Sequence, residues 1–141
     1  MKVDLERAVE ETMILPHMWR AYVDRMTGEV GSFPVEDPEV LDEEAVEEFE
    51  RLEETGRLVF LPSPNEIGEE RVVERYLADL EGRDSEASDQ LVRAWRGQPR
   101  WRLFKHKLVE LGLREEYDEQ LSHAMRREIR DLLDIEGLAY E

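Results

Sequence analysis

Residues 18–33 read MWRAYVDRMTGEVGSF, and apolar and polar side chains alternate through the first half of this stretch. Alternation with a period of two places every second side chain on the same face, which is typical of a β-strand with one buried side. Gly28 lies in the middle and can adopt the positive φ of a tight turn. Pro34 cannot donate a hydrogen bond to a neighbouring strand, so the second strand should end before it. The stretch therefore predicts a β-hairpin.

Helical patterns flank this hairpin on both sides. Before it, apolar side chains recur on one helical face until Pro16, which predicts a short amphipathic helix. This face comprises Leu5, Ala8, Val9, Thr12 and Met13. After the hairpin, residues 36–54 contain eleven acids and one Arg, yet Val46, Phe49 and Leu52 recur every three positions. We expect a helix there whose narrow apolar edge packs on the core and whose acidic side chains are exposed to solvent.

The next segment predicts a third strand and another helix. The apolar run 58–61 is short enough to be a strand that pairs with the hairpin. Ser63 and Glu66 have the spacing of a capping box, and Pro64 suits the first helical position, so a helix should begin at Ser63. Gly82 is placed to end that helix in a left-handed conformation. The buried face would comprise Val72, Val73, Tyr76, Leu77 and Leu80.

The C-terminal half predicts helices joined by short turns. The polar stretch 83–89 reads as a connector, with Asp84 and Ser85 as capping candidates. Two helical patterns follow, separated at residues 97–99, and a longer one runs to Gly137. Their apolar members are Leu91, Val92 and Trp95, then Trp101, Phe104, Leu108 and Leu111 before Gly112, and finally Tyr117, Leu121, Ala124, Met125, Leu132 and Ile135. Such spacing is typical of an antiparallel helical bundle.

Together these patterns predict one α+β domain over residues 1–141. It would have an N-terminal helix, a small antiparallel β-sheet of about three strands, and a C-terminal helical bundle packed on the sheet. A chain of 141 residues of which 40% are apolar can bury one core.

Composition limits the classes of partner. Acidic residues outnumber basic ones by 36 to 19, and the formal net charge of −17 repels nucleic acid and anionic lipid at long range. The chain has no cysteine, which excludes disulfides, thiolate nucleophiles and zinc sites that depend on sulfur. No stretch resembles a signal peptide or a membrane span. We therefore expect a cytoplasmic protein without a membrane partner.

Several short motifs resemble one bacterial family. They are Tyr22-Val23-Asp24 with Thr27-Gly28-Glu29-Val30, Leu61-Pro62-Ser63 with Glu66, and Trp101-Arg102-Leu103-Phe104-Lys105 continuing to Leu111-Gly112-Leu113. The chain is similar in these motifs to Uncharacterised Protein Family 0158. The similarity covers most of the chain and is strongest from Leu91 to Gly137, although this family usually opens its last helix with a Trp where Tyr117 stands here. The resemblance implies a single bacterial domain with this order of elements, and it implies no activity.

The segment 93–107 departs most from the rest of the chain. It carries a charge of +6 and no acid, so the remaining 126 residues carry −23. Its candidate contact residues are Arg93, Arg96, Arg100, Trp101, Arg102, Lys105 and Lys107. Guanidinium groups bind phosphate or carboxylate, and a helix that starts near Pro99 would add backbone N–H groups.

The aromatic residues of this segment have both a functional and a structural explanation. In the functional one, Trp95, Trp101 or Phe104 could stack on a base if exposed. Trp101 and Phe104 also continue the apolar spacing of Leu108 and Leu111, and the basic residues would then only flank a buried stripe. Alternatively, the basic segment pairs with the acidic residues 36–54, within one molecule or across a dimer.

No residue pattern predicts a catalytic, metal-binding or cofactor-binding site. His17, His106 and His123 lack the spacing of metal ligands. Adjacent acids are too frequent to indicate acid–base catalysis, as in Glu43-Glu44, Glu47-Glu48 and Glu115-Glu116. The serines lack a nucleophile elbow, and the glycines form no phosphate-binding loop.

The sequence favours a noncatalytic protein-interaction module. It would present an acidic surface to a partner protein, or to a second copy of itself, and use the segment 93–107 for contact. One alternative is phosphate or nucleic-acid binding through this segment, which predicts steep salt dependence. Another is a hydrolase or nuclease that uses clustered carboxylates and a divalent cation.

Overall fold

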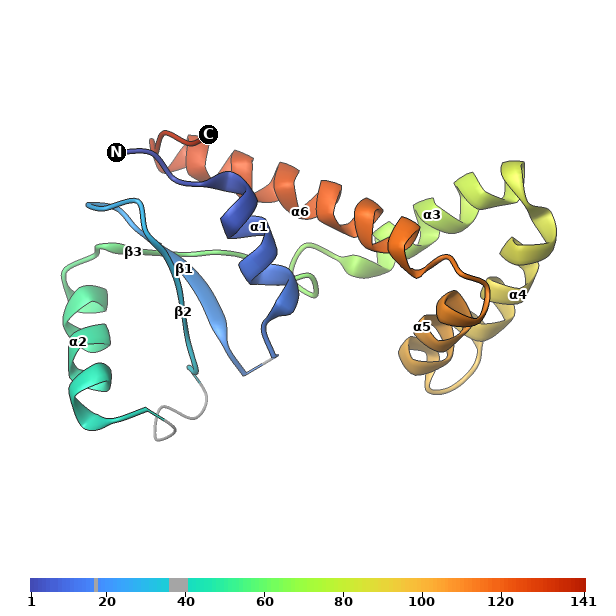
Figure 1. The fold of residues 1–141 in the computed structure, drawn as a ribbon, viewed down its shortest axis with the longest axis horizontal. Helices are drawn as coiled ribbons and strands as arrows, with labels where there is room; N and C mark the ends of the chain where they lie inside the picture. Colours follow the sequence, from blue (N-terminus) through green and yellow to red (C-terminus); the bar gives the residue numbers. More distant parts are fainter. Residues whose placement is uncertain (17, 36–40) are drawn as a thin grey trace. The chain divides into compact units, whose positions relative to one another are not determined.

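The computed structural model describes residues 1–16, 18–35 and 41–141, and these residues form six helices and one three-stranded antiparallel sheet (Figure 1). The α+β prediction is therefore confirmed, with a helix at the N-terminus and helices in the C-terminal half. The elements are α1 (Leu5–Ile14), β1 (Arg20–Asp24), β2 (Val30–Phe33), α2 (Glu43–Glu54), β3 (Leu58–Phe60), α3 (Glu69–Arg83), α4 (Ser85–Arg96), α5 (Arg100–Glu110) and α6 (Arg114–Ile135).

The chain divides into two compact units. The first comprises Met1–Ile67 and Met125–Glu141, and the second comprises Gly68–Ala124. Helix α6 contributes its beginning to the second unit and its end to the first. Folding of residues 1–141 as one domain stays a prediction, as does packing of the whole helical bundle on the sheet.

The sheet of the first unit has the order β2-β1-β3, and both strand pairs are antiparallel. The predicted hairpin is confirmed: β1 and β2 are joined by a turn in which Gly28 has a φ of 77°. Strand β2 ends at Phe33, directly before Pro34. The third strand also pairs with the hairpin as predicted, with Tyr22 opposite Phe60.

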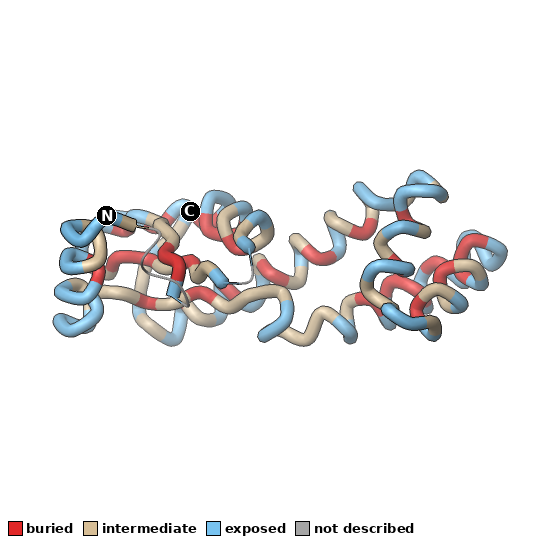
Figure 2. The backbone as a smooth tube through the Cα atoms, turned by 90° about the horizontal axis from the view of Figure 1, so that it is seen from below, coloured by how far each residue is buried: buried red, intermediate tan, exposed pale blue. Residues whose placement is uncertain are grey.

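The two faces of the sheet pack against different helices. Ala21 and Val23 of β1 belong to a buried core that also takes side chains from α1 and from the end of α6. The alternate residue Tyr22 lies on the opposite face, close to Phe49 of α2. Figure 1 accordingly shows α1 and α2 on opposite sides of the sheet, and Figure 2 marks the buried residues in red. The predicted apolar edge of α2 is thus confirmed at Phe49, which is buried.

The predicted start of the third helix at Ser63 is wrong. The capping box does form, since the Ser63 N–H donates to Glu66 Oε1 at 3.3 Å and the Glu66 N–H donates to Ser63 Oγ at 3.2 Å. It closes only a turn, because Gly68 follows with a φ of 81° that breaks helical geometry. Helix α3 therefore begins at Glu69.

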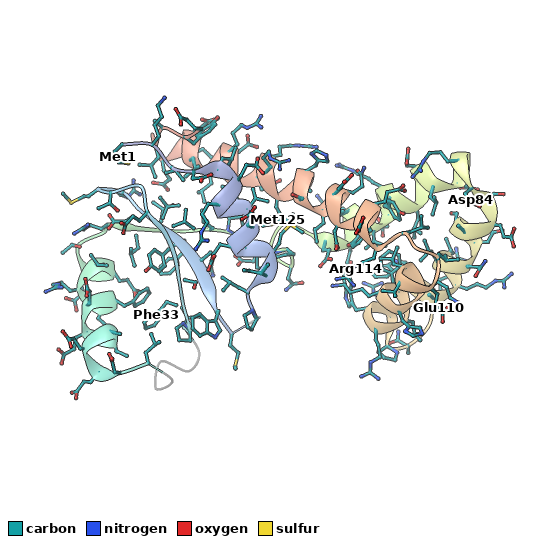
Figure 3. The ribbon with its side chains drawn as sticks, viewed as in Figure 1. Met1, Phe33, Asp84, Glu110, Arg114 and Met125 are labelled. Atoms are coloured by element: carbon teal, nitrogen blue, oxygen red, sulfur yellow. The ribbon has the colours of Figure 1, made fainter. Side chains whose placement is uncertain are left out.

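The predicted end of this helix at Gly82 and the connector 83–89 are also wrong. Gly82 lies inside α3 without a positive φ, and the helix ends at Arg83. Asp84 follows at once as the N-cap of α4, where its Oδ1 accepts a hydrogen bond from the Ala87 N–H at 3.1 Å. One residue thus separates the two helices, because the cap of the second helix directly follows the end of the first (Figure 3).

The remaining helices agree with their predicted bounds, but three apolar positions predicted for α6 are not buried. Helices α4 and α5 are separated at residues 97–99, and Gly112 and Gly137 have positive φ after α5 and α6. On α6, Ala124 and Leu132 are half-buried, and Ile135 is 82% exposed. The buried stripe of this helix recurs every fourth residue and comprises Tyr117, Leu121, Met125, Ile129 and Leu133.

Candidate partner-binding surface on helices α4 and α5

The seven candidate contact residues lie on two consecutive helices of the second unit. Arg93 and Arg96 are in the last turn of α4. Arg100, Trp101 and Arg102 open α5, and Lys105 and Lys107 lie further along it. The helices α4 and α5 pack against each other, so the structure gathers the basic segment on one helical pair.

Arg100 is held by its own unit. Its Nη2 forms an ion pair with Glu70 of α3, and its guanidinium lies 4.1 Å from the ring centroid of Trp95. Stacking on an indole ring and pairing with a carboxylate together fix the orientation of the guanidinium. We therefore assign Arg100 a structural role.

The two lysines of the segment also have acidic neighbours. Lys105 Nζ lies 3.9 Å from Glu69 Oε1 and 5.6 Å from the ring centroid of Trp101. Lys107 Nζ lies 2.7 Å from Glu110 Oε2. Hydrogen bonding to Lys107 is the main reason why the pKa of Glu110 lies below its ordinary value. Both lysine charges are thus partly offset.

Three arginines remain unpaired. Arg93, Arg96 and Arg102 are exposed, and none of them has an ion pair within the described ranges 1–16, 18–35 and 41–141. Four other exposed arginines also lack ion pairs among the described residues. Arg71 and Arg75 lie on α3, which carries five acids, and Arg127 and Arg130 lie on α6, which carries seven. The segment 93–107 itself contains no acid, although Glu86 and Asp89 of α4 line the same pocket as Arg93.

The start of α5 adds further positive potential. Its first turn contains no acid, and its N-cap, Pro99, makes no side-chain cap hydrogen bond. The first N–H groups of a helix have no partner within the helix and bear the positive end of its dipole. Arg100 and Arg102 at this end are therefore unfavourable by about 0.3–1 kcal/mol each. A bound anion would offset this cost.

The aromatic residues of the segment mostly face inward. Of the predicted buried stripe, Phe104 and Leu108 are fully buried, whereas Trp101 and Leu111 are half-buried, and Trp95 is also nearly buried. Trp95 and Phe104 therefore offer no free ring to a base. Trp101 is half-buried and packs edge-on against Trp95, with 4.8 Å between ring centroids. Stacking on a nucleobase could involve Trp101 alone.

Arg93 also faces a pocket between α4 and α5. The pocket has a volume of about 630 Å³, and Leu103 and Lys107 line it from α5. Glu86 and Asp89 line it from α4, so it carries charges of both signs. The mixed lining fits no single class of ion, and the exposed Arg96 and Arg102, which do not line the pocket, carry the stronger signal.

The basic segment forms ion pairs with acids of its own unit. These acids are Glu69, Glu70 and Glu110, which sequence reasoning did not single out. Glu69 also accepts a hydrogen bond from the Tyr117 hydroxyl at 2.8 Å, and burial and this acid raise the pKa of Tyr117. For Glu69 and Glu70 the available signal was their position in the first turn of α3, whereas Glu110 ends α5. Pairing of the segment with residues 36–54 stays a prediction, and residues 36–40 lie outside the described residues.

Other candidate chemistry gains no support from the described residues. No three of their His, Asp and Glu side chains come together in a way that could hold a metal ion. His106 lies 3.0 Å from Glu110 on the surface, and His17 lies outside the described residues. Ser88 is buried and donates to the Leu77 carbonyl at 3.2 Å. Across residues 1–16, 18–35 and 41–141, every helix is too short or too polar to cross a membrane.

Comparisons with family models, curated proteins and solved structures find no match to this chain. Membership of Uncharacterised Protein Family 0158 therefore stays a prediction.

Proposed function

We propose that the chain is a noncatalytic protein-interaction module that binds an acidic segment of a partner protein through Arg93, Arg96 and Arg102. The observation that carries this proposal is the exposure of three arginines without an ion pair in the part of the chain that the structure describes. An arginine can bind a carboxylate through two parallel hydrogen bonds. The start of α5 strengthens the attraction, because its dipole favours an anion.

A protein partner fits the charge distribution better than a nucleic acid. Residues 68–124 hold 13 acids and 10 Lys or Arg residues, whereas the rest of the chain holds 23 acids and nine. A long polyanion bound at the arginines would be repelled by these acids, while a short acidic segment of a protein could contact the arginines alone. The burial of Trp95 and Phe104 also removes two of the three candidate stacking rings.

The proposal can be tested with a fluorescein-labelled peptide of twelve glutamates and with DNA and RNA 12-mers, each titrated with the full chain. We expect the peptide to bind at low salt, and R93E/R96E/R102E to weaken binding at least about tenfold. The control variant R71E/R75E/R127E makes the same change in net charge at three exposed arginines outside the segment. It should retain most of the affinity.

Two results would overturn the proposal. If both triple variants weaken peptide binding equally, the attraction depends only on net charge. If an oligonucleotide binds more tightly than the peptide and loses affinity in R93E/R96E/R102E alone, the surface binds nucleic acid instead. Circular dichroism of each variant checks that the helices remain folded.

A further inference from the structure

A second surface, in the first unit, combines the exposed Ile135 and the half-buried Leu132 and Phe60 with two carboxylates that have no ion pair among the described residues. Glu128, Asp131, Leu132 and Ile135 occupy positions i, i+3, i+4 and i+7 of α6 and so lie on one face of that helix. They line a pocket of about 330 Å³ together with Phe60 and other side chains. Ile135 is 82% exposed, although α6 is a regular helix at this point.

The charges around this pocket are mainly negative. Arg20 is the basic residue of the lining, and its Nη2 lies 3.1 Å from Glu66 Oε2, which offsets its charge. Glu128 and Asp131 form no ion pair with any residue that the structure describes. A partner that covers Ile135 must therefore place its own groups beside two free carboxylates. Basic groups would be attracted there, and acidic groups would be repelled.

We propose that this face of α6 docks a basic amphipathic helix of a partner protein. Apolar side chains of the partner would cover Ile135, Leu132 and Phe60, and its Lys or Arg residues would lie beside Glu128 and Asp131. The occupant is a helix because ridges with i, i+3, i+4 and i+7 spacing are the surfaces on which helices pack against one another. The negative charge of the surroundings disfavours an anionic lipid surface as occupant.

The test uses a fluorescein-labelled 18-residue peptide with leucines along one helical face and lysines elsewhere, titrated with the full chain and followed by fluorescence anisotropy. We expect E128K/D131K to weaken binding at least about tenfold, because two attractive charges become repulsive. The matched control E47K/E50K reverses two exposed carboxylates on α2 that have the same spacing and no ion pair among the described residues. It should weaken binding less than about threefold.

The apolar part of the contact needs its own variant. Ile135→Ser should also weaken binding about tenfold, because it removes the most exposed apolar side chain of this surface. The control Ile14→Ser changes an isoleucine that is 74% exposed on α1 and should have no effect. A peptide with glutamates in place of the lysines is expected to bind at Arg93, Arg96 and Arg102 instead, so Ile135→Ser should not change its binding.

Equal losses in E128K/D131K and E47K/E50K would overturn the proposal, since they would show attraction to net charge only. Unchanged binding by Ile135→Ser would overturn it as well. None of these variants touches Arg93, Arg96 or Arg102, so failure of this docking surface and failure of the proposed function are separate results.

Discussion

Among single residues, Asp24 has a carboxylate that three hydrogen bonds hold in place. It is buried at the end of β1, and its oxygens accept hydrogen bonds from Arg57 Nε at 3.2 Å, Arg57 Nη2 at 2.7 Å and the Met26 N–H at 2.9 Å. Burial would raise the pKa of Asp24, but the Met26 N–H and the Arg57 guanidinium outweigh it, so the pKa lies below its ordinary value. Asp24 thus fixes the hairpin turn and links it to the residue before β3.

Asp24→Asn should lower the free energy of unfolding at pH 7 by about 1–3 kcal/mol, because buried charge-assisted hydrogen bonds are lost. A carboxyl whose pKa is lowered by folding stabilises the fold above the pKa of the unfolded chain, about 3.9, and loses that contribution as pH falls through its folded pKa. The stability of the wild-type chain should therefore fall more steeply than that of the variant below about pH 4.

Urea unfolding of both proteins between pH 7 and pH 2 measures this difference. Asp118→Asn is the control, because Asp118 forms an exposed pair with Arg114 at 3.1 Å. It should change stability by less than about 1 kcal/mol. Parallel pH profiles of Asp24→Asn and the wild type would contradict the prediction.

Among the helices, α3 combines a required glycine with a dispensable one. Gly68 has a φ of 81° at the start of the helix, a conformation that side chains with a Cβ rarely adopt. Gly82 lies inside the helix without a positive φ, and a Cβ added there would meet no atom within 4 Å. The sequence alone suggested the opposite role for Gly82.

Gly82→Ala should raise the free energy of unfolding by about 0.5–1 kcal/mol, because alanine loses less backbone entropy than glycine when the helix forms. Gly68→Ala should lower it by about 1 kcal/mol, since alanine is strained at positive φ. Thermal unfolding followed by circular dichroism measures both. A destabilised Gly82→Ala variant would show that this glycine has a role in the native state.

For the whole molecule, α6 contributes side chains to two cores. Tyr117 packs with α3, α4 and α5 in the second unit, whereas Met125, Ile129 and Leu133 pack with the sheet and α1 in the first. A continuous helix can couple the unfolding of two cores, because fraying in one part removes helical hydrogen bonds next to the other. We therefore expect the chain to unfold in one transition.

Fluorescence can test this expectation, because Trp19 lies in the first unit and Trp95 and Trp101 lie in the second. In a Trp19→Phe background, Val23→Ala should create a cavity in the first core and destabilise the fold by about 1–3 kcal/mol. The fluorescence midpoint in urea should fall together with the midpoint from circular dichroism. Val109→Ala, at an exposed position, should shift neither. A fluorescence midpoint that stays fixed in Val23→Ala would show that the units unfold separately.

Local patterns predicted most helices and strands, because side-chain spacing and the glycine or proline at the ends largely specify where these elements form. The alternation in residues 18–24 identified β1, and the three-residue recurrence around Phe49 identified α2. The errors lie where two local signals compete. The capping box at Ser63 is real but Gly68 interrupts the helix, and Gly82 resembles a stop although Asp84 provides the next cap.

Sequence reasoning located the basic segment, because an acid-free run of six charges is visible without a structure. It could not distinguish Arg100 from Arg102. Arg100 forms an ion pair with Glu70, which lies about 30 positions earlier in the chain and meets Arg100 only after folding, whereas Arg102 has no ion pair among the described residues. It also could not find the docking face of α6, because the spacing of Ile135 fits a buried stripe and its exposure depends on which side of the helix packs on the core. Charge and periodicity are properties of the chain, whereas pairing and exposure arise from contacts between distant residues.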